Sequence, residues 1–507
     1  YAEAWFLPDA GDIPGGYATE GTWYEFFAQK AKALHGVEWA PGTATFQYPN
    51  TQRAATLWFH DHTLGMTRLN VYAGPAGFYI LRGGPADAVF DSRTGRKAIL
   101  PGPAPALADS PDAKYYEIPM AIQDRAFTRN GQLFYPDTRA YFDEYAGPYV
   151  PDSDVSPIWN PEFFGNTLIV NGRTWPFLDV EQRRYRFRVL NGCNSRFLIL
   201  DFASIPGVRV WQIGSDGGFL PRPVNLQAKQ QRLLLAPAER ADLIVDFTTV
   251  SEGRFILRNV GPDEPFGGGE PQDDFDVADP RSTGRVMQFR VHRARAADPT
   301  TPPEYLQLPP VVRPSGGTRR RLALIELMSD FTDGPSEAHL GNVMGNPALG
   351  PATYHDREWA SPVSENPSPG TVETWEFYNT TADAHPMHIH EVQFAVVNRQ
   401  PIESEPDDNE GMTDNTSAHM ASMRMSSGTV RAVGTPHPPE PNELGFKDTV
   451  IAYPDEVTRV RMRFTSAGQF VWHCHIVEHE DNEMMRPYRI GEVQPGQPTE
   501  MDARHGG

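Results

Sequence analysis

The sequence predicts an all-β protein built from β-sandwich domains, on three observations. Glycine and proline are abundant, at 44 and 48 of 507 residues, and long helical periodicities are scarce. Short apolar or β-branched runs recur between turn signals, as in residues 166–172, 254–260 and 457–464, which is typical of strands. Within residues 184–189 apolar side chains alternate with arginines, so we expect a strand with one buried and one solvated face. These strand patterns together predict a β-sandwich or a β-barrel.

Composition indicates a globular protein with room for several cores. Apolar residues make up 39% of the chain and charged residues 22%, and at ~150 residues per domain the length predicts roughly three domains. No apolar run approaches the ~18 residues of a membrane helix, so no membrane span is expected. The net charge of −20 disfavours a nucleic-acid partner, because the phosphates would be repelled.

Two proline- and glycine-rich stretches, residues 82–113 and 292–320, are typical of linkers. They divide the chain into a first domain over residues 1–85, a second over residues 112–295 and a third over residues 318–493. A further polar insert lies inside the third domain and is too polar to form a core of its own.

A weak internal repeat supports copies of one β-domain. In residues 184–200 and again in residues 372–390, an alternating strand runs into an asparagine, a polar loop and a second strand. Only the later copy carries several histidines.

The stretch VWHCHIVEHEDNEMM, residues 471–485, places soft ligands close together. On an extended strand His473 and His475 point to one side and Cys474 to the other. Cys474 can then bind one metal while its neighbours bind a second site behind it. A thiolate, an imidazole and a weak axial thioether, here Cys474, His479 and Met484, belong to a blue-copper ligand set that needs one more histidine.

Two further motifs supply histidines at spacings of two. HPMHIH contains His385, His388 and His390, and WFHDH contains His60 and His62. Three His-x-His pairs among only 15 histidines are hard to obtain by chance. Six histidines would crowd around an imidazole-binding copper cluster: His60, His62, His388, His390, His473 and His475.

Other interpretations explain less. A structural zinc site would have four converging ligands, often paired cysteines, and a Cys-His or Ser-His-Asp nucleophile would leave the extra histidines unexplained. A disulfide between Cys193 and Cys474 is possible by arithmetic alone, but Cys474 stands among metal ligands. We expect Cys193 to be a free, half-buried thiol.

These motifs resemble the copper signatures of the multicopper oxidases. WFHDH looks like the second signature of that family, and HPMHIH and HCHIVEHEDNEMM look like the third and fourth. Further stretches, such as LIVNGRTWPFLDVEQRRYRFRVLNGCNSR and LAPAERADLIVDF, are similar to the branch of bacterial spore-coat laccases, bilirubin oxidase and phenoxazinone synthase. The resemblance covers nearly the whole chain and implies three cupredoxin-like Greek-key β-sandwich domains.

The resemblance also implies a role for each ligand. Type 1 copper would be bound by His385, Cys474 and His479, with Met484 as the weak axial ligand. Type 2 copper would be bound by His388, and the binuclear type 3 site by His60, His62, His390, His473 and His475. Glu480 matches an acidic residue that relays protons to reduced oxygen, although a solvated carboxylate is the plainer interpretation. Copper is the expected cofactor, four ions if N-terminal ligands are present.

The family's first signature, His-x-His-Gly, is missing from the chain. Upstream of His60 only His35 occurs, with Ala33 where its paired histidine would stand. YAEAWF resembles the segment that follows this signature, so we expect the chain to begin just past it, with the first domain incomplete at its N-terminus. The chain's first residues show no signal-peptide pattern, and the compartment stays open.

The implied activity is that of a laccase-like oxidase. It would take single electrons from a small aromatic donor, a phenol or aromatic amine, at type 1 copper, pass them through Cys474, and reduce O2 to water at a trinuclear cluster. We expect a monomer.

Two alternatives stay open. The insert over residues 404–443 carries thioethers that suit Cu(I) and could serve a cuprous or metal oxidase: Met412, Met420, Met423 and Met425, with His419 among them. Alternatively, the chain is a truncated blue-copper electron carrier that reduces no O2 and binds about one copper.

Overall fold

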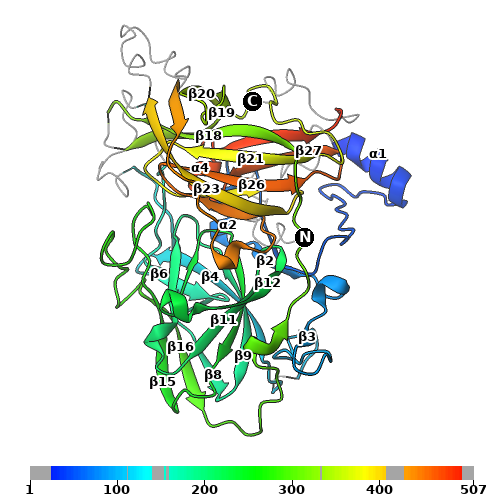
Figure 1. The fold of residues 1–507 in the computed structure, drawn as a ribbon, viewed down its shortest axis with the longest axis vertical. Coiled ribbons are helices and arrows are strands. Elements are labelled where there is room, and N and C mark those ends of the chain that lie inside the picture. Colours follow the sequence, from blue (N-terminus) through cyan, green and yellow to red (C-terminus); the bar gives the residue numbers. More distant parts are fainter. Residues whose placement is uncertain are drawn as a thin grey trace.

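The computed structural model describes residues 24–110, 112–139, 154–155, 159–331, 334–406 and 427–493. Figure 1 shows two bodies of strands, the second domain below and the third above, with α2 and β2 of the first domain between them. Strands outnumber helices throughout these residues, which confirms the predicted all-β class. None of the helices in the described ranges has the length and apolarity needed to cross a lipid bilayer.

The described part of the first domain contains one small sheet. β1 (Thr56–His60) pairs antiparallel with β2 (Ala76–Ile80), and α2 (Thr67–Ala73) lies between them in the chain. α1 (Tyr24–His35) stands at the edge of the molecule (Figure 1) and ends at the exposed His35. The predicted histidine pair therefore begins at the last residue of β1.

The second domain is a sandwich of two sheets. One sheet has the order β13-β10-β15-β16-β8, and the other has the order β12-β11-β14-β9-β4-β6-β7 with β5 joined to β4. Their inner faces supply a core that includes Ile122, Phe187, Leu243 and Phe289. The strands are β4 (Glu117–Phe127), β5 (Leu133–Phe134), β6 (Thr167–Val170), β7 (Arg173–Thr174), β8 (Phe177–Glu181), β9 (Arg184–Asn191), β10 (Leu198–Asp201), β11 (Arg209–Ser215), β12 (Gly218–Asn225), β13 (Arg232–Leu235), β14 (Arg240–Asp246), β15 (Gly253–Asn259) and β16 (Arg285–His292).

The arginine face of β9 differs from the expectation of a solvated surface. Arg186 and Arg188 are each only 4% exposed. Arg186 makes a forked pair with Asp242, and Arg188 donates to Glu117 at 2.6 Å. The arginines are buried because acidic partners on the adjacent strands β14 and β4 neutralise them. These partners are 56 and 71 residues away in the sequence, so a window around β9 shows no sign of them.

The third domain combines a closed barrel with a four-stranded sheet. The barrel runs β18-β19-β20-β24-β23-β26-β21, and the sheet has the order β25-β22-β27-β28. Its elements are β18 (Thr318–Met328), β19 (Pro335–Met344), β20 (Ala352–Arg357), β21 (Val372–Asn379), β22 (His385–Ile389), β23 (Phe394–Pro406), β24 (Ser427–Ala432), β25 (Thr449–Ala452), β26 (Glu456–Arg463), β27 (Gly468–Cys474), α4 (Val477–Glu480) and β28 (Met485–Ile490). All the predicted histidine ligands outside β1 and its following loop come from this domain.

The two repeat stretches fold alike around their asparagines. Asn191 accepts from the backbone N–H of Cys193, and its amide donates to two carbonyls. Asn379 likewise accepts from the N–H of Thr381 and donates to the carbonyls of Asp383 and Ala452. The same asparagine turn thus connects β9 to β10 and β21 to β22.

The two predicted linkers contact each other through a short pair of strands. β3 (Phe90–Asp91) from one linker pairs antiparallel with β17 (Leu306–Gln307) from the other. Val89, Leu306 and Leu308 pack into a small apolar cluster against the second domain. The linkers therefore form part of the second domain's cover, and the predicted domain limits stay predictions.

The two ends of the polar insert also belong to regular structure. β23 and β24 pair over Ile402–Pro406 and Gly428–Ala432, as part of the third domain's barrel. The insert's methionines and His419 lie outside the described residues.

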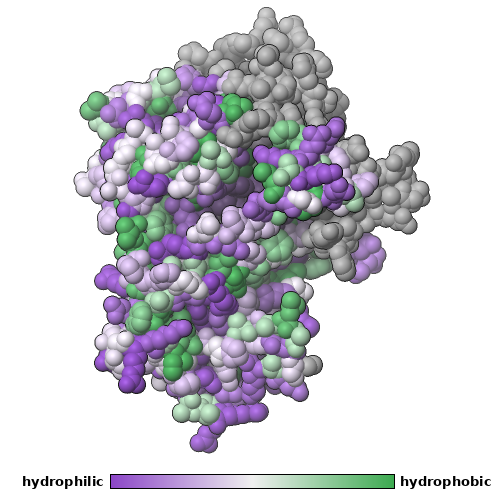
Figure 2. Space-filling view, turned by 90° about the vertical axis from the view of Figure 1, so that its right-hand side faces the viewer, coloured by the Kyte–Doolittle hydropathy of each residue, from purple (hydrophilic) through white to green (hydrophobic). Residues whose placement is uncertain are grey.

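An apolar contact joins the second and third domains. Phe197, Ile199, Ala236 and Phe266 of the second domain pack into the same buried cluster as the third domain's core. On the outside, the face shown in Figure 2 mixes hydrophilic and hydrophobic residues.

Candidate metal centre

Cys474 and two histidines form a compact group of soft donors. Cys474 Sγ lies 3.6 Å from His385 Nδ1 and 3.7 Å from His479 Nδ1, and the two nitrogens are 3.3 Å apart. All three residues are at most 1% exposed. A thiolate and two imidazoles at these separations could share one metal ion.

Strand pairing brings these donors together. β22 runs antiparallel to β27, with Met387 opposite Cys474 and His388 opposite His473. His385 lies at the start of β22, and His479 lies in α4, just after β27. The short loop after Cys474 closes on itself, because Cys474 N donates to the carbonyl of Met484 at 3.1 Å. Met484 is fully buried in the same apolar cluster as Cys474.

Hydrogen bonds orient the group. Thr381 Oγ1 contacts His385 Nε2 at 2.8 Å, which leaves His385 Nδ1 facing Cys474. The N–H of Ile476 donates to Cys474 Sγ at 3.4 Å. Neighbouring groups that fix the ring orientation and bond to the sulfur are typical of metal sites.

Six imidazoles gather on the other side of Cys474. His473 Nε2 lies 3.3 Å from His62 Nε2 and 3.2 Å from His390 Nε2. The ring of His475 lies 5.1 Å from that of His60 and 5.7 Å from that of His388, measured between centroids. The six histidines predicted from the three His-x-His motifs therefore meet, contributed by the first and third domains.

Backbone carbonyls set the tautomers of three of these rings. A carbonyl oxygen can only accept, so the ring nitrogen facing it carries the proton. The Nδ1 atoms of His60, His388 and His473 face carbonyl oxygens at 2.6, 2.7 and 2.9 Å. Each Nε2 then presents a lone pair to the cluster, which is the form that a metal ion binds.

Burial keeps these imidazoles neutral. It lowers the pKa of His479 to about 3, and burial together with the neighbouring His62 lowers the pKa of His60 to about 4. The pKa values of His390, His473 and His475 lie well below the usual range for the same reasons. Neutral imidazoles need not release a proton before they bind a metal.

The donor set fits copper. Burial raises the pKa of the Cys474 thiol well above its usual value, so the thiolate needs a bound cation to form. The Nε2 atoms of His62 and His390 lie only 3.2–3.3 Å from that of His473, close enough for the three nitrogens to share one cation. One thiolate with two imidazoles suits blue copper, and a cluster of imidazoles suits further copper ions.

Glu480 lies beside the imidazole cluster and is buried, not solvated. Its carboxylate oxygens lie 3.4 Å from His62 Nδ1 and 3.3 Å from His473 Nδ1, and Thr67 Oγ1 donates to it at 2.8 Å. Burial raises the pKa of Glu480 well above its usual value. A carboxyl group in this environment can hold a proton at neutral pH.

Sequence reasoning missed several residues that shape the site. Trp58 lies two residues before His60, and its ring lies 4.6 Å from that of His60 and 5.4 Å from that of His475. Its spacing of two placed it on the same strand face, which was a usable signal. Thr381 and Asp448 contact the candidate ligands His385 and His388 through a hydroxyl and a backbone carbonyl, and such contacts leave no sequence motif. Cys193 is free and 4% exposed, more buried than expected.

Fold and site together define a copper protein of the cupredoxin class, with a cysteine-containing site and a histidine cluster on opposite sides of one strand. Comparisons with known proteins agree. The multicopper oxidase family model matches residues 335–494. A laccase from Bacillus stratosphericus is 37% identical over 449 residues, which cover 88% of this chain and 73% of the relative. The laccase of Bacillus subtilis (strain 168) is 36% identical over 448 residues, with 88% and 72% covered.

Solved structures show the same fold. The McoA multicopper oxidase of Aquifex aeolicus superposes with a TM-score of 0.56 at 26% identity, over 87% of this chain and 76% of that one. The chain belongs to the multicopper oxidase family. It is a copper oxidoreductase, and the cofactor of its family is copper in type 1, type 2 and type 3 sites.

Proposed function

We propose that this copper oxidoreductase is a laccase-like oxidase that takes single electrons from phenols or aromatic amines and reduces O2 to water. The position of Cys474 carries the proposal. Its thiol belongs to one donor group, while its neighbour His473 belongs to the other. The backbone between them is a short covalent route that joins two separate sites, one for the organic donor and one for O2.

The residues that would hold copper divide between these sites. The type 1 set is His385, Cys474 and His479 with Met484 as weak axial ligand, the type 2 residue is His388, and the type 3 set is His60, His62, His390, His473 and His475. Bound copper supplies the one-electron chemistry and the binding of O2. The protein fixes the tautomers of the imidazoles and keeps water away from the buried donors.

We assign the supply of protons to Glu480 as part of this proposal. Reduction of O2 to water consumes protons, and Glu480 Oε2 has no hydrogen-bond partner among the described residues. Thr67 holds the other oxygen, Oε1, at 2.8 Å. Oε2 also lies 3.3 Å from His473 Nδ1 and can therefore carry a proton toward the histidine cluster.

Uptake of O2 with a methoxyphenol as donor tests this proposal. We expect the wild type to consume O2 without releasing hydrogen peroxide. Glu480→Gln should slow uptake about 100-fold and leave copper content and blue colour intact, whereas the exposed Glu25→Gln should change nothing. Wild-type protein that binds its copper but oxidises no phenol would contradict the proposal.

A metal-ion donor is a second candidate, because carboxylates lie next to the type 1 group. Glu326 Oε1 is 3.8 Å from His385 Nε2. Burial raises the pKa of Glu326 to about 8 and that of Asp383 to about 6, so a metal ion that binds at Glu326 has to displace its proton at neutral pH. Carboxylates near the type 1 group suit a metal-ion donor such as Fe(II) or Mn(II) better than they suit a phenol donor. In this case Glu326→Gln should lower the oxidation of Fe(II) relative to that of a phenol, and an unchanged ratio would exclude the role.

A further inference from the structure

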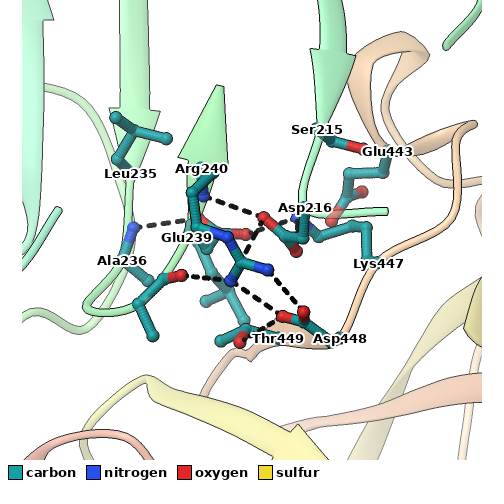
Figure 3. A network of polar contacts seen from close by, with 12 residues as sticks. Ser215, Asp216, Leu235, Ala236, Glu239, Arg240, Glu443, Lys447, Asp448 and Thr449 are labelled. Atoms are coloured by element: carbon teal, nitrogen blue, oxygen red, sulfur yellow. Dashed lines mark hydrogen bonds and ion pairs between the residues drawn. The ribbon is translucent and has the colours of Figure 1, made fainter. Parts of the chain in front are cut away.

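Five buried charged residues lie where the second and third domains meet. Asp216, Glu239 and Arg240 come from the second domain, and Lys447 and Asp448 come from the third (Figure 3). All five are at most 9% exposed. Charged groups are buried in this way only when they are paired.

The pairing crosses the domain boundary. Arg240 makes a forked contact with both carboxylate oxygens of Asp448, one of them at 2.8 Å. The Lys447 ammonium bridges Asp216 at 2.8 Å and Glu239 at 3.0 Å. Figure 3 shows the Arg240 side chain reaching from the second domain's strand to Asp448.

The same guanidinium also touches the first domain. Arg240 Nε donates to the carbonyl of Thr56 at 3.0 Å. Thr56 is the first residue of β1, and His60 is the last. One side chain of the second domain therefore contacts both of the other domains that supply histidines to the cluster.

Asp448 connects this network to His388. Its backbone carbonyl accepts from His388 Nδ1 at 2.7 Å, and its carboxylate Oδ1 lies 3.7 Å from the same nitrogen. The proton on Nδ1 leaves the Nε2 lone pair free for a metal. The backbone around Asp448 is fixed in turn by its forked contact with Arg240.

The Asp448 carboxylate is the acidic group of the network next to His388. It lies 3.7 Å from His388 Nδ1, and its forked contact with Arg240 fixes it there. A carboxylate behind an imidazole favours a cation on the far side of the ring.

We propose that the Arg240–Asp448 ion pair positions His388, so that the second domain, which supplies none of the predicted ligands, sets how tightly type 2 copper is held. Arg240 and Asp448 are positioning residues: they touch no copper and act through the orientation of one imidazole. The proposal rests on the proposed function, because it takes His388 as a copper ligand.

Copper retention in three variants of the copper-loaded protein tests the proposal. Arg240→Gln and Asp448→Asn break the pair, and Asp242→Asn breaks a different forked pair, that of Asp242 with Arg186, on the same strand β14. Each protein is titrated with a copper chelator while the type 2 signal is followed by electron paramagnetic resonance and the type 1 site by its blue absorbance.

We expect the two pair-breaking variants to lose the type 2 signal at chelator concentrations at least about tenfold lower than the wild type, with the blue band unchanged. Asp242→Asn should keep both signals. A second readout needs no copper: in protein labelled with 15N-histidine, the pair-breaking variants should show a mixture of His388 tautomers where the wild type shows the Nδ1–H form alone.

If both variants held type 2 copper as tightly as the wild type, the proposal would be overturned. A parallel loss of the blue band and the type 2 signal would overturn it too, because it would mean that the pair only holds the domains together. Asp448→Asn preserves the size of the side chain, so it tests the proposal even if Arg240→Gln does not fold. A wild type without any type 2 signal would refute the assignment of His388 and the inference with it, whereas unaffected variants would refute the inference alone.

Discussion

Cys474 is the single side chain on which the proposed type 1 site depends most. It faces His385 and His479 and has a thiol whose pKa is raised by burial. Cys474→Ser replaces the thiolate by a poor copper ligand, so we predict loss of the blue absorbance and of type 1 copper. The visible spectrum of copper-loaded protein measures this. Cys193→Ala removes the other buried thiol and should keep the colour, and a blue Cys474→Ser variant would refute the assignment.

His339 gives the molecule a specific pH dependence. Burial lowers its pKa, but hydrogen bonds to Asp356 and Glu337 prevail and raise the pKa from 6.5 to about 9. Folded protein therefore keeps a proton that the unfolded chain has released, and this stabilisation, at most about 3 kcal/mol, is complete below pH ~6.5 and lost as pH rises through ~9.

The thermal unfolding midpoint as a function of pH measures this contribution. We predict that His339→Gln flattens the fall in stability between pH ~6.5 and ~9. His292→Gln, at an exposed histidine beside Asp179, should keep the wild-type slope. Equal slopes in all three proteins would show that His339 is not the group responsible.

The candidate donor residues could be picked out from the sequence, because metals select few atom types and strand geometry imposes spacings of two. His60, Cys474 and His475 stood in readable motifs. The residues that orient them did not, because Thr381 and Asp448 act through a hydroxyl and a backbone carbonyl that almost any loop could supply.

At the scale of single elements, β9 shows what hydrophobic periodicity can predict and what it cannot. Alternation predicted a strand correctly, but the buried state of Arg186 depends on Asp242 in the neighbouring strand β14. The expectation of a solvated arginine face failed because that partner lies 56 residues away.

Breaking this pair tests its contribution to stability. Arg186→Met leaves the Asp242 carboxylate buried without its main partner, so we predict a loss of about 3–5 kcal/mol in unfolding free energy. Thermal or denaturant unfolding measures the loss. The double variant Arg186→Met with Asp242→Leu should recover most of it, because no charge is left unpaired. A single variant as stable as the wild type would refute this account of β9.

Helix α2 is fixed by a residue of another domain. Asp481 accepts from the N–H groups of Thr67 and Arg68 at 3.0 and 2.8 Å, and from the Arg68 guanidinium at 3.0 Å. These first N–H groups have no partner inside the helix. The contact holds α2 against α4, which carries His479 and Glu480.

Removing this cap should loosen α2 selectively. We predict that Asp481→Ala costs about 1–2 kcal/mol locally and speeds hydrogen exchange of the α2 amides at least about tenfold. Glu25→Ala, in the first turn of α1, serves as the control and should leave α2 unchanged. Unchanged α2 exchange in Asp481→Ala would contradict the capping role.

At the scale of the whole molecule, the second domain supplies none of the predicted metal ligands and still contacts the two domains that do. The second domain packs Phe197 and Phe266 into the core of the third, and its Arg240 reaches Asp448 and Thr56. Composition and turn signals predicted the β-sandwich units. They could not predict that the two linkers pair through β3 and β17, because that contact joins segments about 200 residues apart.

The proposed oxidase holds two copper sites whose ligands Cys474 and His473 are consecutive residues of one strand. Copper per chain, measured by elemental analysis together with the visible and paramagnetic resonance spectra, tests this arrangement most directly. We predict an intense blue type 1 absorbance, and beside it additional copper of type 2 and type 3 character held by the histidine cluster. A chain that binds about one copper, blue and without further signals, would be an electron carrier and would contradict the oxidase claim.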